Sequence, residues 1–251
     1  EEWFPKYNIN DKLQNNKWVE DLTKELSEDF YIKRKIGEND DEICKIIQKD
    51  LIEEFIIYVN KNSYPVKSTI KSSIYETNDF LLKEENKNIT LIEYAVFFGS
   101  IQIFNYLRQN GAELKQSLWL YAVHGKDAEI INFLEENKIM DNKEKFSMNF
   151  NKKNVSFELI FKESIKCHHI DVANYIQNNY LQNENGYSKD IMIDGLKYYN
   201  FFFIQSNIDN EETFFYLCKY DYYLLVFILL EKIDINLNII IIYIMIFLII
   251  F

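Results

Sequence analysis

The sequence predicts an all-α fold in which helix-turn-helix repeats of unequal length stack into a solenoid. Three observations predict it. The 251 residues include only six Gly and two Pro, too few for the many tight turns of a β-rich fold. Apolar residues recur three and four positions apart, as on one face of a helix. A small residue also recurs about eight positions before an apolar cluster, a self-similarity typical of repeat architectures.

The segment 90–114 is the clearest repeat. Thr90 and Glu93 have the spacing of a capping box, in which each side chain accepts a hydrogen bond from the backbone N–H of the other residue. The first helix is expected to end at Gly99, which readily adopts a left-handed conformation, and the small side chain of Ala95 would let neighbouring helices approach. The second helix places three apolar residues on one face: Ile103, Phe104 and Leu107.

Further copies of this pattern follow along the chain. Three good copies are 117–139 with Ala122, 158–179 with Ser164, and 213–232 with Cys218 in the small position. Two weaker copies are 42–62 and 195–205, the second with Gly195. In the stacked arrangement we expect Leu107 and Leu134 to be buried.

The segments outside the repeats suggest a cap and two insertions. Residues 1–36 are expected to form an N-terminal helical cap, with a helix over 16–36, because the open end of a stack must be shielded from water. The repeat domain would cover 37–236. Insertions near 63–87 and 140–155 are expected to lie on the surface, where long loops can carry recognition.

The tail 237–251 is almost wholly apolar and carries no charge. As a helix its 15 residues would span about 22 Å, short of the hydrocarbon core of about 30 Å. Three interpretations stay open: a truncated or miscoded continuation of the repeats, a membrane segment, or a segment packed on the last repeat.

Charge and cysteine content argue against several classes of function. A net charge of −11 means that the chain lacks the excess positive charge that attracts the phosphates of nucleic acid. Three widely spaced cysteines make no disulfide framework and favour a reducing, cytoplasmic setting. Cys167, His168 and His169 are adjacent, and neighbouring helical residues point about 100° apart, so they could bind one metal only with partners from elsewhere in the chain. His124 is expected at a surface or turn position. We therefore expect no catalytic residues, cofactor or metal.

Several of these residues coincide with a known repeat motif. Thr90-Leu91-Ile92-Glu93-Tyr94-Ala95 stands where ankyrin repeats have Thr-Pro-Leu-His-x-Ala, and Gly99 and Asn110-Gly111-Ala112 match the later glycines of that motif. The chain thus resembles the ankyrin-repeat family, with Leu91 in place of the proline and Glu93 in place of the histidine. More narrowly, 36–236 resembles the ankyrin-like proteins of trichomonad parasites that share a domain of unknown function.

The resemblance implies a non-catalytic scaffold or adaptor for protein partners of unknown identity. The alternative is the same scaffold tethered to a membrane through 237–251. In ankyrin-type stacks the first helices line the concave side, so residues just before each inter-helix turn face the partner. The expected contacts are Phe97, Phe98, Val123, His124 and Lys166, with Glu113, Lys115 and Gln116 of a connector beside them. Equally, Phe97 or Phe98 could pack on the next repeat or under the 63–87 insertion.

Overall fold

The computed structural model describes residues 28–82, 88–140, 155–181, 189–203 and 211–232. Over these ranges the chain is α-helical, with one short 3-10 helix and an isolated antiparallel bridge between Thr69 and Thr90, and it contains no strand. The predicted all-α class is confirmed.

The helices follow one another in pairs, each joined by a short turn. The pairs are α4 (Glu42–Gln48) with α5 (Ile52–Lys61), α7 (Leu91–Phe97) with α8 (Ile101–Gln109), α9 (Leu118–Gly125) with α10 (Ala128–Glu136), α11 (Phe157–Lys166) with α12 (Ile170–Tyr180), and α14 (Glu211–Lys219) with α15 (Tyr223–Lys232). Between the last two pairs, α13 (Lys189–Lys197) is followed by the 3-10 helix η2 (Phe201–Phe203). Two further helices lie outside the pairs: α3 (Glu28–Ile36) and α6 (Asp79–Leu82).

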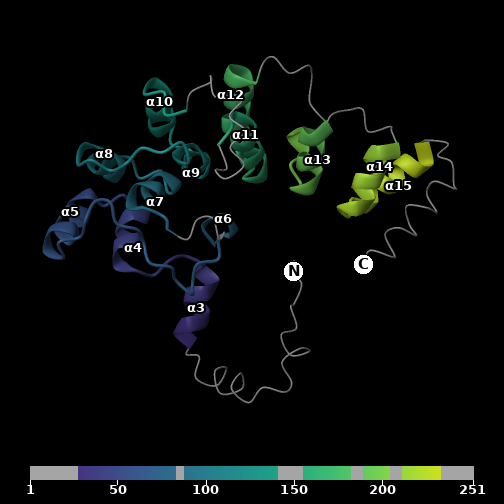
Figure 1. Cartoon of the computed structure of the whole chain (residues 1–251). Helices are drawn as coiled ribbons and strands as arrows, with labels where there is room; N and C mark the ends of the chain where they lie inside the picture. Colours follow the sequence, from purple (N-terminus) through teal and green to yellow (C-terminus); the bar gives the residue numbers. More distant parts are fainter. Residues whose placement is uncertain (1–27, 83–87, 141–154, 182–188, 204–210, 233–251) are drawn as a thin grey trace.

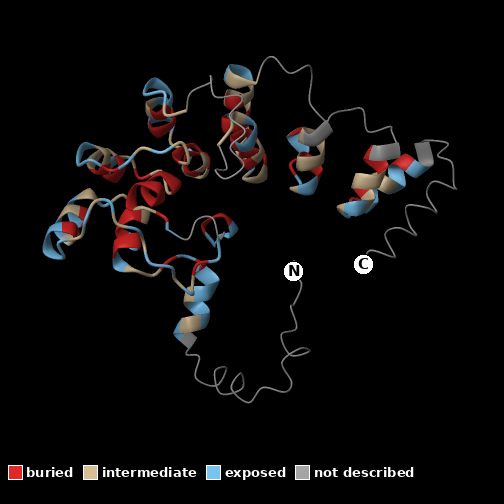
Figure 2. Cartoon of the chain, viewed as in Figure 1, coloured by how far each residue is buried: buried red, intermediate tan, exposed pale blue. Residues whose placement is uncertain are grey.

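The first helices of successive pairs pack on one another in chain order. Helix α4 contacts α7, α7 contacts α9, α9 contacts α11, α11 contacts α13, and α13 contacts α14. Figure 1 shows the pairs following one another along an arc. Buried residues gather where α4, α7 and α9 meet, whereas α3 and the outer side of α5 are largely exposed (Figure 2). Leu107 and Leu134 have no exposed surface, as predicted.

The capping box at the start of α7 is also confirmed. The N–H of Glu93 donates to the Thr90 hydroxyl, and the Glu93 carboxylate accepts from the N–H of Thr90. The hydroxyl of Ser117 also donates to Glu93, at 2.9 Å. Glu93 therefore joins the start of α7 to the start of α9.

A turn with a left-handed residue ends the first helix of each of the five described pairs and also ends α13. One residue in each turn has a left-handed φ, between 51° and 68°: Asp50, Gly99, Lys126, His168, Tyr199 and Asp221. In the Gly99 and His168 turns, the next N–H bonds back to the carbonyl of Ala95 or Ser164, the Schellman pattern that closes a helix. Only one of these residues is glycine, so the recurrence of the turn cannot be recognised from residue type alone.

The residue after this turn ties most pairs to the preceding pair. Its side chain donates to a carbonyl near the end of the preceding first helix: Ser100 to Ile47, His169 to Val123, Asn200 to Ile165 and Tyr222 to Leu196. Between α7 and α9, Asp127 stands in this place, where a carboxylate cannot donate. In place of a side-chain hydrogen bond, the backbone of Gly125 packs closely against the backbone of Val96 and Gly99.

The register of the last pair differs from the prediction by one residue. Leu217, not Cys218, takes the position of Ala95, because the carbonyl of Leu217 accepts the N–H that follows the turn. Leu217 is fully buried, eight positions before Leu225. Side-chain size points to Cys218, but the register is set by turn geometry, which does not depend on side-chain size.

The 63–87 insertion is more than the surface loop that its composition suggests. Phe80 and Leu81 of α6 are buried, with 4% and 7% of their surface exposed. The ring of Phe80 stacks on Phe97 with centroids 5.9 Å apart. Residues 83–87 of this insertion and most of the 140–155 insertion lie outside the described residues.

The structure describes part of the predicted cap and none of the predicted tail. The cap helix is described from Glu28 onward, and the tail 237–251, with the membrane interpretation attached to it, lies outside the described residues. Among the helices that are described, none is both long and apolar enough to cross a membrane.

Glu135 links α10 to α12 and provides a test of this packing. Its carboxylate accepts hydrogen bonds from the hydroxyls of Tyr175 and Tyr180, and these bonds lower the pKa of Glu135. A carboxyl group with a lowered folded-state pKa stabilises the fold above its unfolded-state pKa, and this contribution is lost as pH falls through the folded-state value. We expect the Glu135→Gln variant to lose less stability than wild type between pH 5 and pH 3 in urea unfolding. Equal pH dependence of the two proteins would contradict the linkage.

Candidate functional site

A cavity of about 790 Å³ lies where the C-terminal ends of α7, α9 and α11 meet the insertion. One part of its lining comes from the insertion and the segment after α3, including Glu38, Glu76, Asp79 and Phe80. The facing part comes from the helix ends, with Phe97, Phe98, His124, Lys166, Cys167 and His169. Three successive helix pairs therefore contribute to one hollow.

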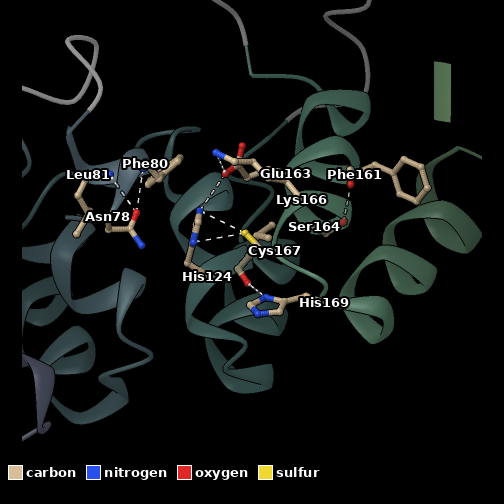
Figure 3. Close-up of polar contacts among 11 residues, drawn as sticks. Asn78, Phe80, Leu81, His124, Phe161, Glu163, Ser164, Lys166, Cys167 and His169 are labelled. Atoms are coloured by element: carbon tan, nitrogen blue, oxygen red, sulfur yellow. Dashed lines mark hydrogen bonds and ion pairs between the residues drawn. The ribbon is translucent and has the colours of Figure 1, made fainter. Parts of the chain in front are cut away.

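His124, Glu163 and Cys167 converge beside this cavity. Nε2 of His124 lies 3.2 Å from Oε1 of Glu163. Sγ of Cys167 lies 3.5 Å from Nδ1 and 3.7 Å from Nε2 of the same ring. One candidate ligand atom from each residue lies within 4.8 Å of the other two. Figure 3 shows the three side chains pointing toward one another from α9 and α11.

Aromatic rings hold His124 in place. Its ring stacks on Phe97 with centroids 4.7 Å apart and lies 4.4 Å from the ring of Phe80. Phe98 is half-buried beside Phe97 and Tyr94. Only 12% of the His124 side chain and 9% of the Glu163 side chain are exposed. The imidazole and carboxylate are thus held in an environment that excludes most water.

The electrostatics of the cavity are mainly acidic. Glu38 and Asp79 are exposed, whereas Glu76 is buried and accepts N–H bonds from Thr77 and Asn78. Burial raises the pKa of Glu76. Lys166 introduces a positive charge, 3.8 Å from Oε1 of Glu163.

His169 takes a structural rather than a ligand position. Burial lowers the pKa of His169, which favours the neutral ring. Since a carbonyl can only accept, Nδ1 of His169 donates to the carbonyl of Val123. This hydrogen bond ties the pair of α11 and α12 to the pair of α9 and α10.

The predicted contact residues separate into two groups. Phe98, His124 and Lys166 line the cavity with accessible surface. Phe97 also lines it but is 8% exposed and packs on both the insertion and His124, one of the alternatives expected from the sequence. Val123 is buried, at 2% exposed, and contributes its carbonyl to His169.

The connector residues lie elsewhere. Glu113, Lys115 and Gln116 precede the start of α9, whereas His124 lies near its end. At 1.5 Å per residue the length of α9 separates them by about 12 Å. Glu113 and Lys115 are exposed and paired at 3.6 Å. The connector is therefore not beside the cavity.

The sequence identified Cys167 but not its neighbours in space. Nε2 of His168 contacts the carbonyl of Tyr198 at 2.7 Å, and His169 turns to Val123. The partner that reaches Cys167 is His124, 43 positions earlier in the chain, which is half-buried rather than on the surface. The sequence contains one signal for this contact. His124 and Cys167 each stand just before the turn that joins the two helices of their pair. The first helices of these adjacent pairs pack together.

Two chemistries are compatible with a thiol, an imidazole and a carboxylate in this arrangement. A base beside a thiol, oriented by a carboxylate, resembles the machinery of nucleophilic catalysis. The same three groups are also common zinc ligands. A nucleophile that attacks an acyl group needs hydrogen-bond donors for the developing oxyanion, commonly backbone N–H groups. Here the N–H groups of Cys167, His168 and His169 already donate to carbonyls of α11, so they are not available to an oxyanion. This favours zinc binding over nucleophilic catalysis.

Comparison with family models, curated proteins and solved structures finds no match for the chain.

Proposed function

We propose that the chain is a non-catalytic protein-interaction scaffold built on a solenoid of ankyrin-like repeats. The order of helix contacts supports the solenoid, since each first helix packs on the next one along the chain. The recurring left-handed turn and the side-chain bonds between pairs support the repeat interpretation. The Thr90–Ala95 and Gly99 matches support the ankyrin-like assignment.

The cavity at the helix ends is the proposed docking site, and its lining is the observation that carries the proposal. Half-buried Phe98 offers an aromatic contact, and exposed Glu38 and Asp79 add negative charge. Aromatic side chains anchor many protein interfaces, and charge complementarity directs the choice of partner. We propose that the partner inserts a lysine or arginine flanked by apolar residues.

A peptide-library screen against the full chain tests this proposal. The selected peptides should be rich in Lys or Arg beside apolar residues, and their binding should weaken with salt. Phe98→Ser should weaken binding of a selected peptide by about thirtyfold or more, because loss of an interface anchor costs at least about 2 kcal/mol. Asp79→Asn should also weaken binding, and its effect should shrink at high salt, because it removes an exposed charge. The measurement is a fluorescence binding titration.

Phe202→Ser is the matched control, since Phe202 is an exposed phenylalanine of η2 that does not line the cavity. It should bind the peptide like wild type. Thermal melting of each variant checks that Phe98→Ser leaves the fold intact. Binding that survives both cavity substitutions, or that Phe202→Ser removes equally, would place the interaction elsewhere.

A further inference from the structure

We propose that Nε2 of His124, Oε1 of Glu163 and Sγ of Cys167 form a three-ligand site for Zn²⁺, with its fourth position open to the cavity. The site lies between α9 and α11, so a bound ion would clamp two neighbouring helix pairs together. This inference does not depend on the proposed scaffold function, because it concerns the metal alone.

Two of the three distances between the ligand atoms are close to those of a tetrahedral zinc site. Zinc bonds of about 2.3 Å to sulfur and about 2.0 Å to nitrogen or oxygen imply ligand separations of roughly 3.3 to 3.6 Å. The separation between Nε2 of His124 and Oε1 of Glu163 is 3.2 Å, and that between Nε2 and Sγ of Cys167 is 3.7 Å. The pair of Sγ and the carboxylate oxygen is within 4.8 Å.

Metal binding needs only a local adjustment of the His124 ring. Sγ of Cys167 is nearly equidistant from Nδ1 and Nε2, so it lies to the side of the ring rather than along the Nε2 lone pair. A rotation of the imidazole that carries its proton on Nδ1 would direct Nε2 at an ion held by Glu163 and Cys167. The Phe80 and Phe97 rings limit the ring to this region.

The surrounding charges favour a cation. Cys167 caps the C-terminal end of α11, and His124 lies in the last turn of α9. The C-terminal end of a helix carries a partial negative charge, which stabilises cations. Lys166 opposes this attraction, with its ammonium 3.8 Å from Oε1 of Glu163 and its side chain partly exposed. Glu38, Glu76 and Asp79 in the same cavity add carboxyl groups to it.

The other two cysteines lack this setting. Cys44 is fully buried, and burial raises its pKa to about 12, so that its thiol holds its proton. Burial also raises the pKa of Cys218 in α14. Neither belongs to the one cluster of potential metal ligands found among the described residues. Cys218 is half-buried like Cys167 and therefore provides a matched control.

The experiment is a titration of the chelator-treated full chain with Zn²⁺ and with Co²⁺ as a spectroscopic substitute. One equivalent of Zn²⁺ should bind and raise the melting temperature, since an ion that binds the folded state stabilises it. Co²⁺ should produce a thiolate charge-transfer band in the near ultraviolet. Cys167→Ser should remove this band. His124→Ala and Glu163→Gln should each weaken Zn²⁺ binding by more than about tenfold, the least that loss of a supporting group outside the ligand set typically costs.

Cys218→Ser and His168→Asn are the controls and should bind Zn²⁺ like wild type. Circular dichroism of each metal-free variant reports whether it has folded, and Glu163→Gln preserves the shape of the replaced side chain. The wild-type Co²⁺ spectrum tests the proposal even if a variant fails to fold. The proposal is overturned if wild type shows no charge-transfer band, if Cys218→Ser removes it, or if the folded ligand variants bind Zn²⁺ as tightly as wild type.

Discussion

Replacing Leu107 with alanine is expected to lower the free energy of unfolding by about 2–5 kcal/mol, as large-to-small substitutions in protein cores do. Leu107 lies on α8, is fully buried and belongs to the main hydrophobic core. The substitution removes apolar contacts and leaves a cavity that rigid helices cannot fully close. Urea unfolding of the variant and wild type measures the loss.

The effect of Leu107→Ala should be local. Leu196, Phe214, Leu217, Tyr222 and Leu229 form a second core cluster, separate from that of Leu107. In a stack where each pair contacts only its neighbours, damage reaches adjacent pairs first. Hydrogen exchange should therefore speed up in α4, α5 and α7 to α10 and stay unchanged in α14 and α15. Uniformly faster exchange would argue for one cooperative globule instead.

Leu159→Ala is the matched control for this prediction. Leu159 lies on α11 with 40% of its surface exposed. Exposed substitutions usually change stability by less than about 0.5 kcal/mol. If Leu159→Ala costs as much as Leu107→Ala, burial of these leucines is not what stabilises the stack.

Gly125→Ala is expected to destabilise the protein by about 3 kcal/mol, the upper end of the usual cost of overpacking. A methyl group on Gly125 would lie 2.2 Å from the carbonyl oxygen of Val96 and 2.8 Å from the nitrogen of Gly99. Both are backbone atoms, so no side chain can rotate away and α7 and α9 must separate. Urea unfolding measures the stability, and Zn²⁺ affinity should fall as well, because His124 lies on the displaced helix end.

Gly111→Ala separates this clash from backbone strain. Gly111 has a φ of +84° and no atom within 4 Å of the added methyl group. Its replacement should therefore cost only the left-handed conformation, about 1–2 kcal/mol. Gly125 is not among the residues with positive φ, so its cost comes from packing alone. A smaller loss for Gly125→Ala than for Gly111→Ala would contradict the close approach.

The residues that line the cavity were only partly visible in the sequence. Phe98, His124 and Lys166 were expected near a binding face because they precede inter-helix turns, and all three line the cavity. The sequence leaves open that Phe97 or Phe98 packs under the 63–87 insertion, but nothing in it singles out Phe80. The burial of Phe80 against Phe97 depends on the path of the chain between α5 and α7. No local pattern encodes that path.

By itself the sequence determined the features that depend on neighbours a few residues apart. These are the all-α class, the capping box of Thr90 and Glu93, and the apolar helix faces that bury Leu107 and Leu134. Only the tertiary structure decided the register of the last pair and the meeting of His124 with Glu163 and Cys167. The physical reason is that helix periodicity and capping act within one or two turns, whereas contacts between pairs depend on how helix ends stack. That stacking places Cys167 beside a histidine 43 residues away and turns its sequence neighbours, His168 and His169, toward backbone carbonyls.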